Sequence, residues 1–331
     1  MRRGPGPALA LAAASLLVAL GAAETALRFV KPPWTIPYPP VCYWPRLYQQ
    51  FDPHGYRLWP SQRTAVRSPD GRLIGIVSNA DGFRSRREFR APDPRPRIVV
   101  LGDSMVFGSG VEEPERFTEV LEAGEPGWRI DNLGMTAYGP DLMLRALEHV
   151  GVALRPDVVV FALFSHAFYR VMPEVTGVGF PLPRFELRNG VLTTVPYPAR
   201  PAWMRLMLVQ GGRYLYWRYA GASVPLNIAI LDRLRALGAG HGFVPALVFV
   251  PARQERRDDR RRRDWLEAYA ERHGVPFADL GPALRAAGGE RLYIPHDAHW
   301  NADGHGVVAD ALRPFLAPLV RKTLATGRGQ G

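Results

Sequence analysis

The chain has 331 residues, of which 47% are hydrophobic, enough for one large domain with extensions or for two small domains. Its formal net charge is +11, and nearly all of the positive charge comes from arginine. No basic stripe interleaved with aromatic residues accompanies that charge, so the composition argues against nucleic-acid binding. The single cysteine, Cys42, excludes an internal disulfide.

The N-terminus has the pattern of an export segment. Two arginines precede an apolar stretch over residues 8–23, which Glu24 then interrupts. Either a signal peptidase cuts after this stretch and the chain is secreted, or residues 1–30 stay as a membrane anchor, which we favour. In both cases the arginines remain in the cytoplasm, and the rest of the chain faces the periplasm or the cell exterior.

Residues 31–94 are predicted to be an extension that packs on the domain after it. Proline, tryptophan and tyrosine dominate it up to residue 70, which excludes regular helix and favours extended chain over the alternative of a free spacer. A strand is predicted over residues 71–77. A turn follows over residues 79–84, and its Arg84 either reaches an active-site rim or ties the extension to the domain.

From residue 95 to residue 322 the pattern alternates between strands and helices. Apolar runs predict strands over residues 98–101, 129–133, 158–164, 246–250 and 277–280. Helices are predicted over residues 116–123, 141–150, 264–273 and 306–319. This alternation predicts a parallel sheet with helices on both faces.

An insertion over residues 168–242 interrupts the alternation. It contains a predicted hairpin around Asn-Gly at residues 184–195 and an aromatic helix at residues 203–219, which we expect to pack in a core. The insertion could form a lid or an acceptor-binding wall, or simply cover sheet edges. The arginine-rich run at residues 253–263 predicts a solvated face, with binding of an anionic polymer or lipid headgroups as the alternative. Residues 323–331 are predicted to be a flexible tail.

Two distant motifs could supply a nucleophile and its base. Gly-Asp-Ser at residues 102–104 follows a predicted strand, so Ser104 should lie at the carboxyl edge of the sheet, where ligands bind. A serine hydroxyl needs a base, for which His299 is the candidate, with Asp297 as the carboxylate that orients it. The same stretch contains three rivals: His296, Asp303 and His305. In the alternative without chemistry, Ser104 is a turn residue and His299 a packed loop histidine.

Together, Gly-Asp-Ser after a strand and Asp-x-His-Trp-Asn-x-x-Gly-His at residues 297–305 resemble the SGNH/GDSL hydrolase superfamily. The Asp-x-His-Trp spelling also resembles the alginate O-acetyltransferase branch. The resemblance implies a flavodoxin-like three-layer α/β/α fold with a central parallel sheet, and no metal or organic cofactor. It also implies an oxyanion hole formed by Ser104, Ala137 and His166, where the family has a glycine in place of Ala137 and an asparagine in place of His166.

The function that the resemblance implies is acyl-ester chemistry through an acyl-enzyme. The chain would be a serine-dependent hydrolase or O-acyltransferase, acting on acyl esters, chiefly acetyl, of cell-envelope or exported polysaccharide. The altered oxyanion residues leave one alternative, a non-catalytic, degenerate domain that binds a glycan. No pattern in the sequence specifies the oligomeric state.

Overall fold

The computed structural model of the protein describes residues 6–30, 32, 44–51, 55–173, 175, 178–181, 184–195 and 201–325. The chain divides into two compact units, one formed by Met1–Val41 with Pro198–Ala222 and the other by Cys42–Tyr197 with Ser223–Gly331. The predictions for Cys42, for the two N-terminal arginines and for most of the proline-rich stretch before residue 44 lie outside the described residues.

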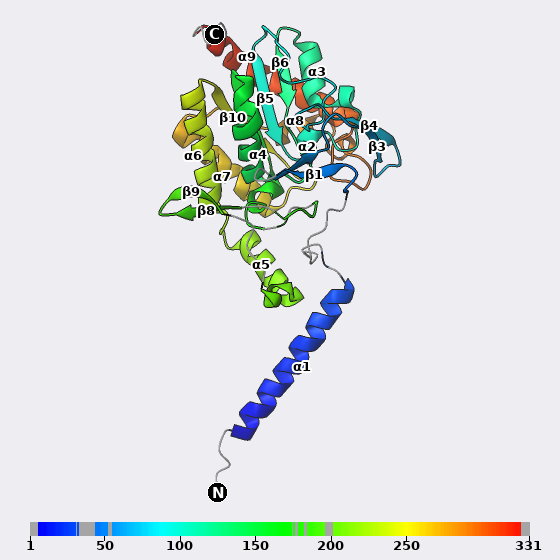
Figure 1. Cartoon of the computed structure of the whole chain (residues 1–331), viewed down its shortest axis with the longest axis vertical. Helices are drawn as coiled ribbons and strands as arrows, with labels where there is room; N and C mark the ends of the chain where they lie inside the picture. Colours follow the sequence, from blue (N-terminus) through cyan, green and yellow to red (C-terminus); the bar gives the residue numbers. More distant parts are fainter. Residues whose placement is uncertain are drawn as a thin grey trace. The chain divides into compact units, whose positions relative to one another are not determined.

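A five-stranded parallel sheet forms the centre of the larger unit, in the order β11-β10-β7-β5-β6 (Figure 1). Its strands are β5 (Arg97–Gly102), β6 (Arg129–Asn132), β7 (Val158–Phe164), β10 (Val244–Val250) and β11 (Phe277–Asp279). Numbered along the chain, the order is 2-1-3-4-5, which is that of the flavodoxin-like doubly wound fold. The predicted three-layer α/β/α architecture is confirmed.

Strand β7 lies in the middle of the sheet and matches its prediction at both ends. It pairs in parallel with β5, where Val160 lies opposite Val100, and with β10, where Val160 lies opposite Ala246. All seven of its residues are buried. An unbroken apolar run is what a strand covered on both faces requires.

Helices cover the two faces of the sheet in two sets, each with its own hydrophobic cluster. One face packs against α4 (Pro140–Ala146), α6 (Val224–His241) and α7 (Arg257–His273). The other packs against α3 (Phe117–Gly124), α8 (Gly281–Ala286) and α9 (Ala302–Ala325). Along β5, Val99 and Leu101 join the first cluster while Ile98 and Val100 join the second, as the two-residue period of a strand dictates.

Three helix predictions need correction. Helix α7 begins at Arg257 instead of residue 264, because the Arg256 N–H donates to Asp259 at 2.8 Å and starts the helix inside the arginine run. Helix α9 begins at Ala302, since Asn301 Oδ1 accepts from the Gly304 N–H at 2.9 Å and caps it there. The helix predicted over residues 141–150 is α4 followed by a π-helical turn, Leu147–Gly151. The sequence did not predict α6.

The extension folds into two short antiparallel pairs. They are β1 (Tyr48–Phe51) with β2 (Gly55–Leu58), and β3 (Arg63–Arg67) with β4 (Leu73–Val77). The strand predicted at residues 71–77 is β4, and the other three were expected only as extended chain. Tyr56 and Ile74 are fully buried and belong to the same cluster as Val99 of the sheet. The predicted hairpin is also present, as β8 (Arg184–Arg188) and β9 (Val191–Val195), with Asn189 and Gly190 at positive φ.

The buried side chain of Arg84 connects the extension with the domain. Its guanidinium is buried and donates to four carbonyls, of Gly75 at 3.0 Å, Phe107 at 3.2 Å, Gly108 at 2.7 Å and Val111 at 2.8 Å. Burial lowers the pKa of Arg84 to about 9. Of the two interpretations of this arginine, the structural tie is therefore correct.

The smaller unit contains α1 (Gly6–Val30), a 3-10 turn at Ala202–Arg205 and α5 (Met207–Tyr219). Residues Ala8–Val30 of α1 are long and apolar enough to cross a membrane, a test that a signal sequence near an N-terminus also passes. We expected the aromatic residues of this region to pack in a core, and for several of them that is wrong. Trp203 is 54% exposed, and Tyr216 and Tyr219 are each 59% exposed.

Candidate active site

The turn that carries Ser104 depends on the glycine before it. Strand β5 ends at Gly102, and the chain passes through Asp103 into the short helix α2 (Ser104–Phe107). A Cβ on Gly102 would lie 2.1 Å from Val106 Cγ2, so only glycine lets α2 fold back over the strand end. Asp103 caps α2 by accepting the Met105 N–H at 3.0 Å. Ser104 is thereby held, half-buried, at the carboxyl edge of the sheet.

The loop that carries His299 is closed by its own backbone and by an arginine. The Ile294 N–H donates to the His299 carbonyl at 2.9 Å. Arg253, which follows β10, donates to the carbonyls of Asp297 at 2.8 Å and Ile294 at 3.2 Å. Arg253 was predicted only as the start of a charged face, whereas its side chain fixes this loop.

The loop after Ser104 and the loop that carries His299 lie close together at Gly110, in the loop after α2. Gly110 has φ +87°, and a Cβ there would lie 2.2 Å from Ile294 Cδ1. A larger residue would therefore push the loop after Ser104 away from the loop that carries His299.

Ser104, His299 and Asp297 form one hydrogen-bonded chain. His299 Nε2 lies 2.7 Å from Ser104 Oγ, and His299 Nδ1 contacts Asp297 Oδ1. The same Asp297 oxygen accepts the backbone N–H of His299 at 2.7 Å. The hydrogen bond with the ring lowers the pKa of Asp297, which keeps it ionised near neutral pH. A carboxylate on Nδ1 holds the proton there and leaves Nε2 free to accept the serine proton.

The rivals of His299 lie elsewhere. His305 is buried, its Nδ1 accepts the Phe117 N–H at 3.2 Å, and burial lowers its pKa to about 3. His296 and Asp303 are exposed. Within the described part of the chain, His299 is the one candidate base in hydrogen-bond contact with Ser104.

Ala137 lies in the turn after β6, beside the Ser104 turn. The Met135 N–H donates to the Gly102 carbonyl at 3.1 Å, which ties the two turns together. Ala137 has φ +63°, a conformation that favours glycine and costs an alanine about 1 kcal/mol. Among the described residues, the backbone N–H groups of Ser104 and Ala137 have no hydrogen-bond acceptor. Both are therefore available to a developing oxyanion.

His166 follows β7 and is paired with a buried carboxylate. Its Nε2 lies 3.2 Å from Asp259 Oδ1. Burial raises the pKa of Asp259, but hydrogen bonds from His166 and the Arg256 N–H outweigh this effect and lower the pKa to about 2. With the Nε2 proton directed at Asp259, the Nδ1 of a neutral ring is an acceptor. His166 could then donate to an oxyanion only as the imidazolium.

Sequence reasoning missed Arg170. Its Nη1 lies 2.8 Å from Asp103 Oδ2 and 3.0 Å from the Tyr138 carbonyl. One guanidinium thus connects the residue before Ser104 with the residue after Ala137. Arg170 lies within the predicted insertion, and its only sequence signal is its place shortly after the buried strand β7.

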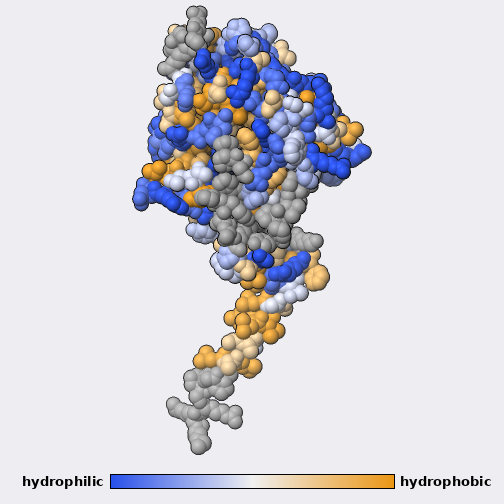
Figure 2. All heavy atoms as spheres, in the orientation of Figure 1, coloured by the Kyte–Doolittle hydropathy of each residue, from blue (hydrophilic) through white to orange (hydrophobic). Residues whose placement is uncertain are grey.

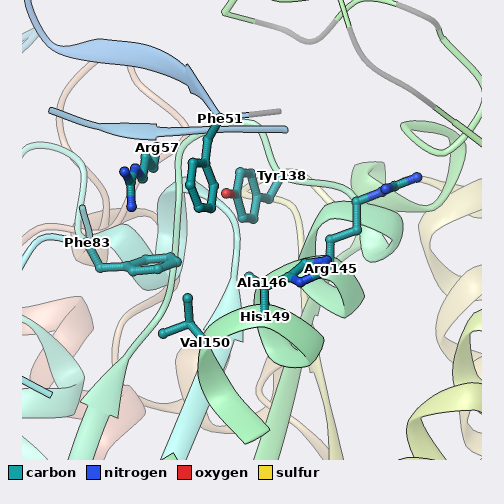
Figure 3. A pocket seen from close by; sticks show the side chains of 8 residues that line it. All are labelled: Phe51, Arg57, Phe83, Tyr138, Arg145, Ala146, His149 and Val150. Carbon is teal, nitrogen blue, oxygen red and sulfur yellow. The ribbon is translucent and has the colours of Figure 1, made fainter. Parts of the chain in front are cut away.

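A small hollow lies between the β1–β2 pair and α4 (Figure 3). It is lined by Phe51, Arg57, Phe83, Tyr138, Arg145, Ala146, His149 and Val150. The three residues of the hydrogen-bonded chain are not part of this lining. In the described ranges, no group of three or more His, Cys, Asp or Glu side chains could hold a metal ion.

Comparison with known proteins gives likenesses of structure only. No family model matches the sequence, and no curated protein matches it. One similar structure is described as a candidate lipolytic protein of the G-D-S-L family from Desulfitobacterium hafniense DCB-2, with TM-score 0.45 and 12% identity over 67% of this chain and 100% of that chain.

Two further similar structures are described as esterases. One is the psychrotrophic esterase EstA from Pseudoalteromonas sp., with TM-score 0.43 and 14% identity over 69% of this chain and 98% of that chain. The other is the acetyl xylan esterase AlAXEase, with TM-score 0.42 and 15% identity over 65% of this chain and 97% of that chain. Scores this low do not assign an activity, so the assignment depends on the sheet order and the site geometry.

Proposed function

We propose that this chain is an SGNH-type serine enzyme that hydrolyses or transfers acyl esters. One observation carries the proposal: a 2.7 Å contact between His299 Nε2 and Ser104 Oγ, with Asp297 on the other ring nitrogen. These residues come from opposite ends of the domain and meet at the carboxyl edge of its sheet. The arrangement is that of a Ser-His-Asp triad, which is recognised by geometry and not by sequence position.

The reaction would run through an acyl-enzyme. Ser104 Oγ attacks the ester carbonyl while His299 Nε2 takes its proton, and Asp297 stabilises the imidazolium that forms. His299 then gives the proton to the leaving alkoxide, the C–O bond of the ester breaks, and the acyl group stays on Ser104. A second hydroxyl, of water in a hydrolase or of a sugar in an O-acyltransferase, attacks the acyl-enzyme with His299 again as the base. The bond between the acyl group and Ser104 Oγ then breaks, and His299 returns the proton to Ser104.

The backbone N–H groups of Ser104 and Ala137 would bind the oxyanion, with the His166 ring as a third donor. Each donor of this kind is worth about 3 kcal/mol of barrier. The substrates we propose are acyl esters, chiefly acetyl esters, of a cell-envelope or exported polysaccharide. The Asp-x-His-Trp spelling at residues 297–300 supports transfer as well as hydrolysis.

The proposed organisation of the chain follows its pattern. Residues 1–30 would anchor it in the membrane, residues 31–94 would pack on the domain, and residues 95–322 would carry the chemistry outside the cytoplasm. The long apolar α1 supports the anchor. Cleavage of α1 as a signal peptide would instead release the same domain.

A chromogenic acetyl ester tests the proposal. Ser104→Ala should reduce turnover by about 10⁶-fold, the scale seen when the nucleophile of a triad is removed. Ser109→Ala is the matched control, because it removes the same hydroxyl five residues further along the chain and should leave turnover unchanged. Turnover by the Ser104→Ala variant at the wild-type rate, with circular dichroism showing that both variants are folded, would exclude this mechanism.

A further inference from the structure

The unit that contains α1 and α5 carries large apolar side chains that face outward. Six of them lie between residues 203 and 219, and each is at least 36% exposed: Trp203, Leu206, Leu208, Leu215, Tyr216 and Tyr219. Exposed apolar side chains in contiguous patches mark a surface that something else covers.

On α5 these side chains share one face of the helix. Leu208, Leu215, Tyr216 and Tyr219 fall at positions i, i+7, i+8 and i+11, which superimpose along one side at 3.6 residues per turn. Gly212 completes that side and has open space around it. The opposite side holds the three buried residues of α5, which are Met207, Gln210 and Trp217. The helix is thus two-sided, and its outward side is the apolar one.

A carboxylate of α1 holds the start of α5. Glu24 Oε2 accepts the Leu208 N–H at 3.1 Å, and Arg28 pairs with Glu24 at 2.9 Å. The Glu24 side chain is only 13% exposed, although it belongs to an apolar helix. A carboxylate at a helix N-terminus is favourable, so this contact docks α5 on the last turns of α1.

The charge of the segment has one sign. Residues 201–219 contain Arg205, Arg213 and Arg218 and no acidic residue. On the helical projection, Arg213 and Arg218 fall on the two borders of the apolar side. Arginines that border an apolar, aromatic face are typical of helices that lie in a bilayer interface, where the charged groups reach lipid phosphates.

We propose that α5 is an interfacial helix that lies in the headgroup region of the membrane beside the point where α1 leaves it. Its partner is an anionic phospholipid surface, with the apolar side of α5 toward the acyl chains and the arginines toward phosphates. Figure 2 shows that hydrophobic residues also dominate the visible surface of α1, the helix that α5 contacts. The inference rests on the proposed membrane anchor.

The test uses the full chain in vesicles of phosphatidylcholine with a minority of phosphatidylglycerol. In a Cys42→Ser background, Leu215→Cys places an environment-sensitive fluorophore on the apolar side of α5. Ala12→Cys places the fluorophore on α1. Glu271→Cys, at an exposed position of α7, is the matched control. Lipids that carry a nitroxide near the headgroup should quench most of the emission at positions 12 and 215 and leave position 271 unchanged.

Each other outcome overturns the inference at a different point. Quenching at position 12 without quenching at position 215 would leave the anchor intact and contradict the interfacial helix. No quenching at either position would contradict the anchor as well. Shielding at position 215 that grows with protein density and is insensitive to nitroxide lipid would show that a second copy covers this face.

Discussion

At the scale of single residues, the orientation of His299 is fixed from two directions. Asp297 Oδ1 binds both the ring Nδ1 and the backbone N–H of the same histidine, so rotation of the ring would break one contact while the other held the loop. Arg253 donates to the Asp297 carbonyl at 2.8 Å. The proposed base is therefore positioned before any substrate arrives, which is what efficient proton transfer requires.

Replacement of Asp297 by asparagine should preserve the conformation of the loop but no longer hold the His299 ring in the tautomer that carries its proton on Nδ1. Asn can still accept the His299 N–H, but its amide no longer requires a proton on Nδ1. We expect kcat for ester turnover to fall by about 10⁴-fold, as in other triads whose carboxylate becomes an amide. Steady-state kinetics with an unchanged thermal unfolding midpoint would support this role, and near-normal kcat would contradict it.

Arg170 should act as a positioning residue. Its guanidinium bridges Asp103 and the Tyr138 carbonyl, and so fixes the turn of Ser104 relative to that of Ala137. Arg170→Gln should lower kcat by about 10- to 100-fold with little change in KM. Without the guanidinium, the backbone N–H groups of Ser104 and Ala137 would no longer be held in position relative to each other. Arg170→Lys should restore part of kcat. A change confined to KM would instead make Arg170 a substrate contact.

The sequence predicted the site unevenly. Ser104, His299 and Asp297 could be identified because each lies in a short motif after or before a regular element. Arg170 and Asp259 could not, since each acts through a partner that only the fold brings near. The positive φ of Ala137 could be anticipated only from the glycine that the resembling family has at this position, because alanine itself gives no local sign of a left-handed turn.

At the scale of elements, buried polar contacts join the helices near the site. His305 of α9 accepts the N–H of Phe117, the first residue of α3, at 3.2 Å, and its ring stacks on the Phe117 ring with the centroids 6.0 Å apart. The contact needs a neutral ring with a free Nδ1 lone pair. Burial first, and then the positive charges of Arg116 and Arg84, lower the pKa of His305 to about 3.

This contact predicts a loss of stability in mild acid. The unfolded chain protonates His305 below about pH 6.5, whereas the folded chain resists protonation until about pH 3, so acid favours the unfolded state. The free energy of unfolding should fall by about 1.4 kcal/mol per pH unit in that window from this group alone. His305→Asn keeps an acceptor without titrating, so it isolates the effect.

Urea unfolding of the detergent-solubilised chain from about pH 7 to about pH 5 checks this prediction. The free energy of unfolding of the wild type, minus that of His305→Asn, should decrease as the pH falls. A difference that stays constant with pH would show that His305 is protonated, or accessible, in the folded state.

Elements were predictable where one physical signal dominated. Strand β7 matched its prediction because an unbroken apolar run of seven residues is typical of a strand that is buried on both faces of a parallel sheet. Helix α7 began earlier than expected because its arginines hide a cap formed by Arg256 and Asp259. The strands β1, β2 and β3 escaped prediction because proline and aromatic residues near them masked the alternation.

At the scale of the whole molecule, the parallel sheet brings the motifs of Ser104 and His299 together, although they are far apart in the sequence. Strand β5 ends at Gly102 and the loop of His299 precedes the last helix, yet the two meet because all five strands point the same way. The order β11-β10-β7-β5-β6 places β5 next to the centre. The fold class could be predicted from the alternation of strands and helices. The hydrogen bond between Ser104 and His299 could not, because it depends on the conformations of two loops that are far apart in the sequence.

The most direct test of this account is covalent labelling by a fluorophosphonate, read by mass spectrometry of the peptide that contains Ser104. We expect one adduct on Ser104, none in Ser104→Ala, and labelling slower by about 10³-fold or more in His299→Gln. An intact, folded chain that forms no adduct on Ser104 would contradict the enzyme and favour a glycan-binding domain.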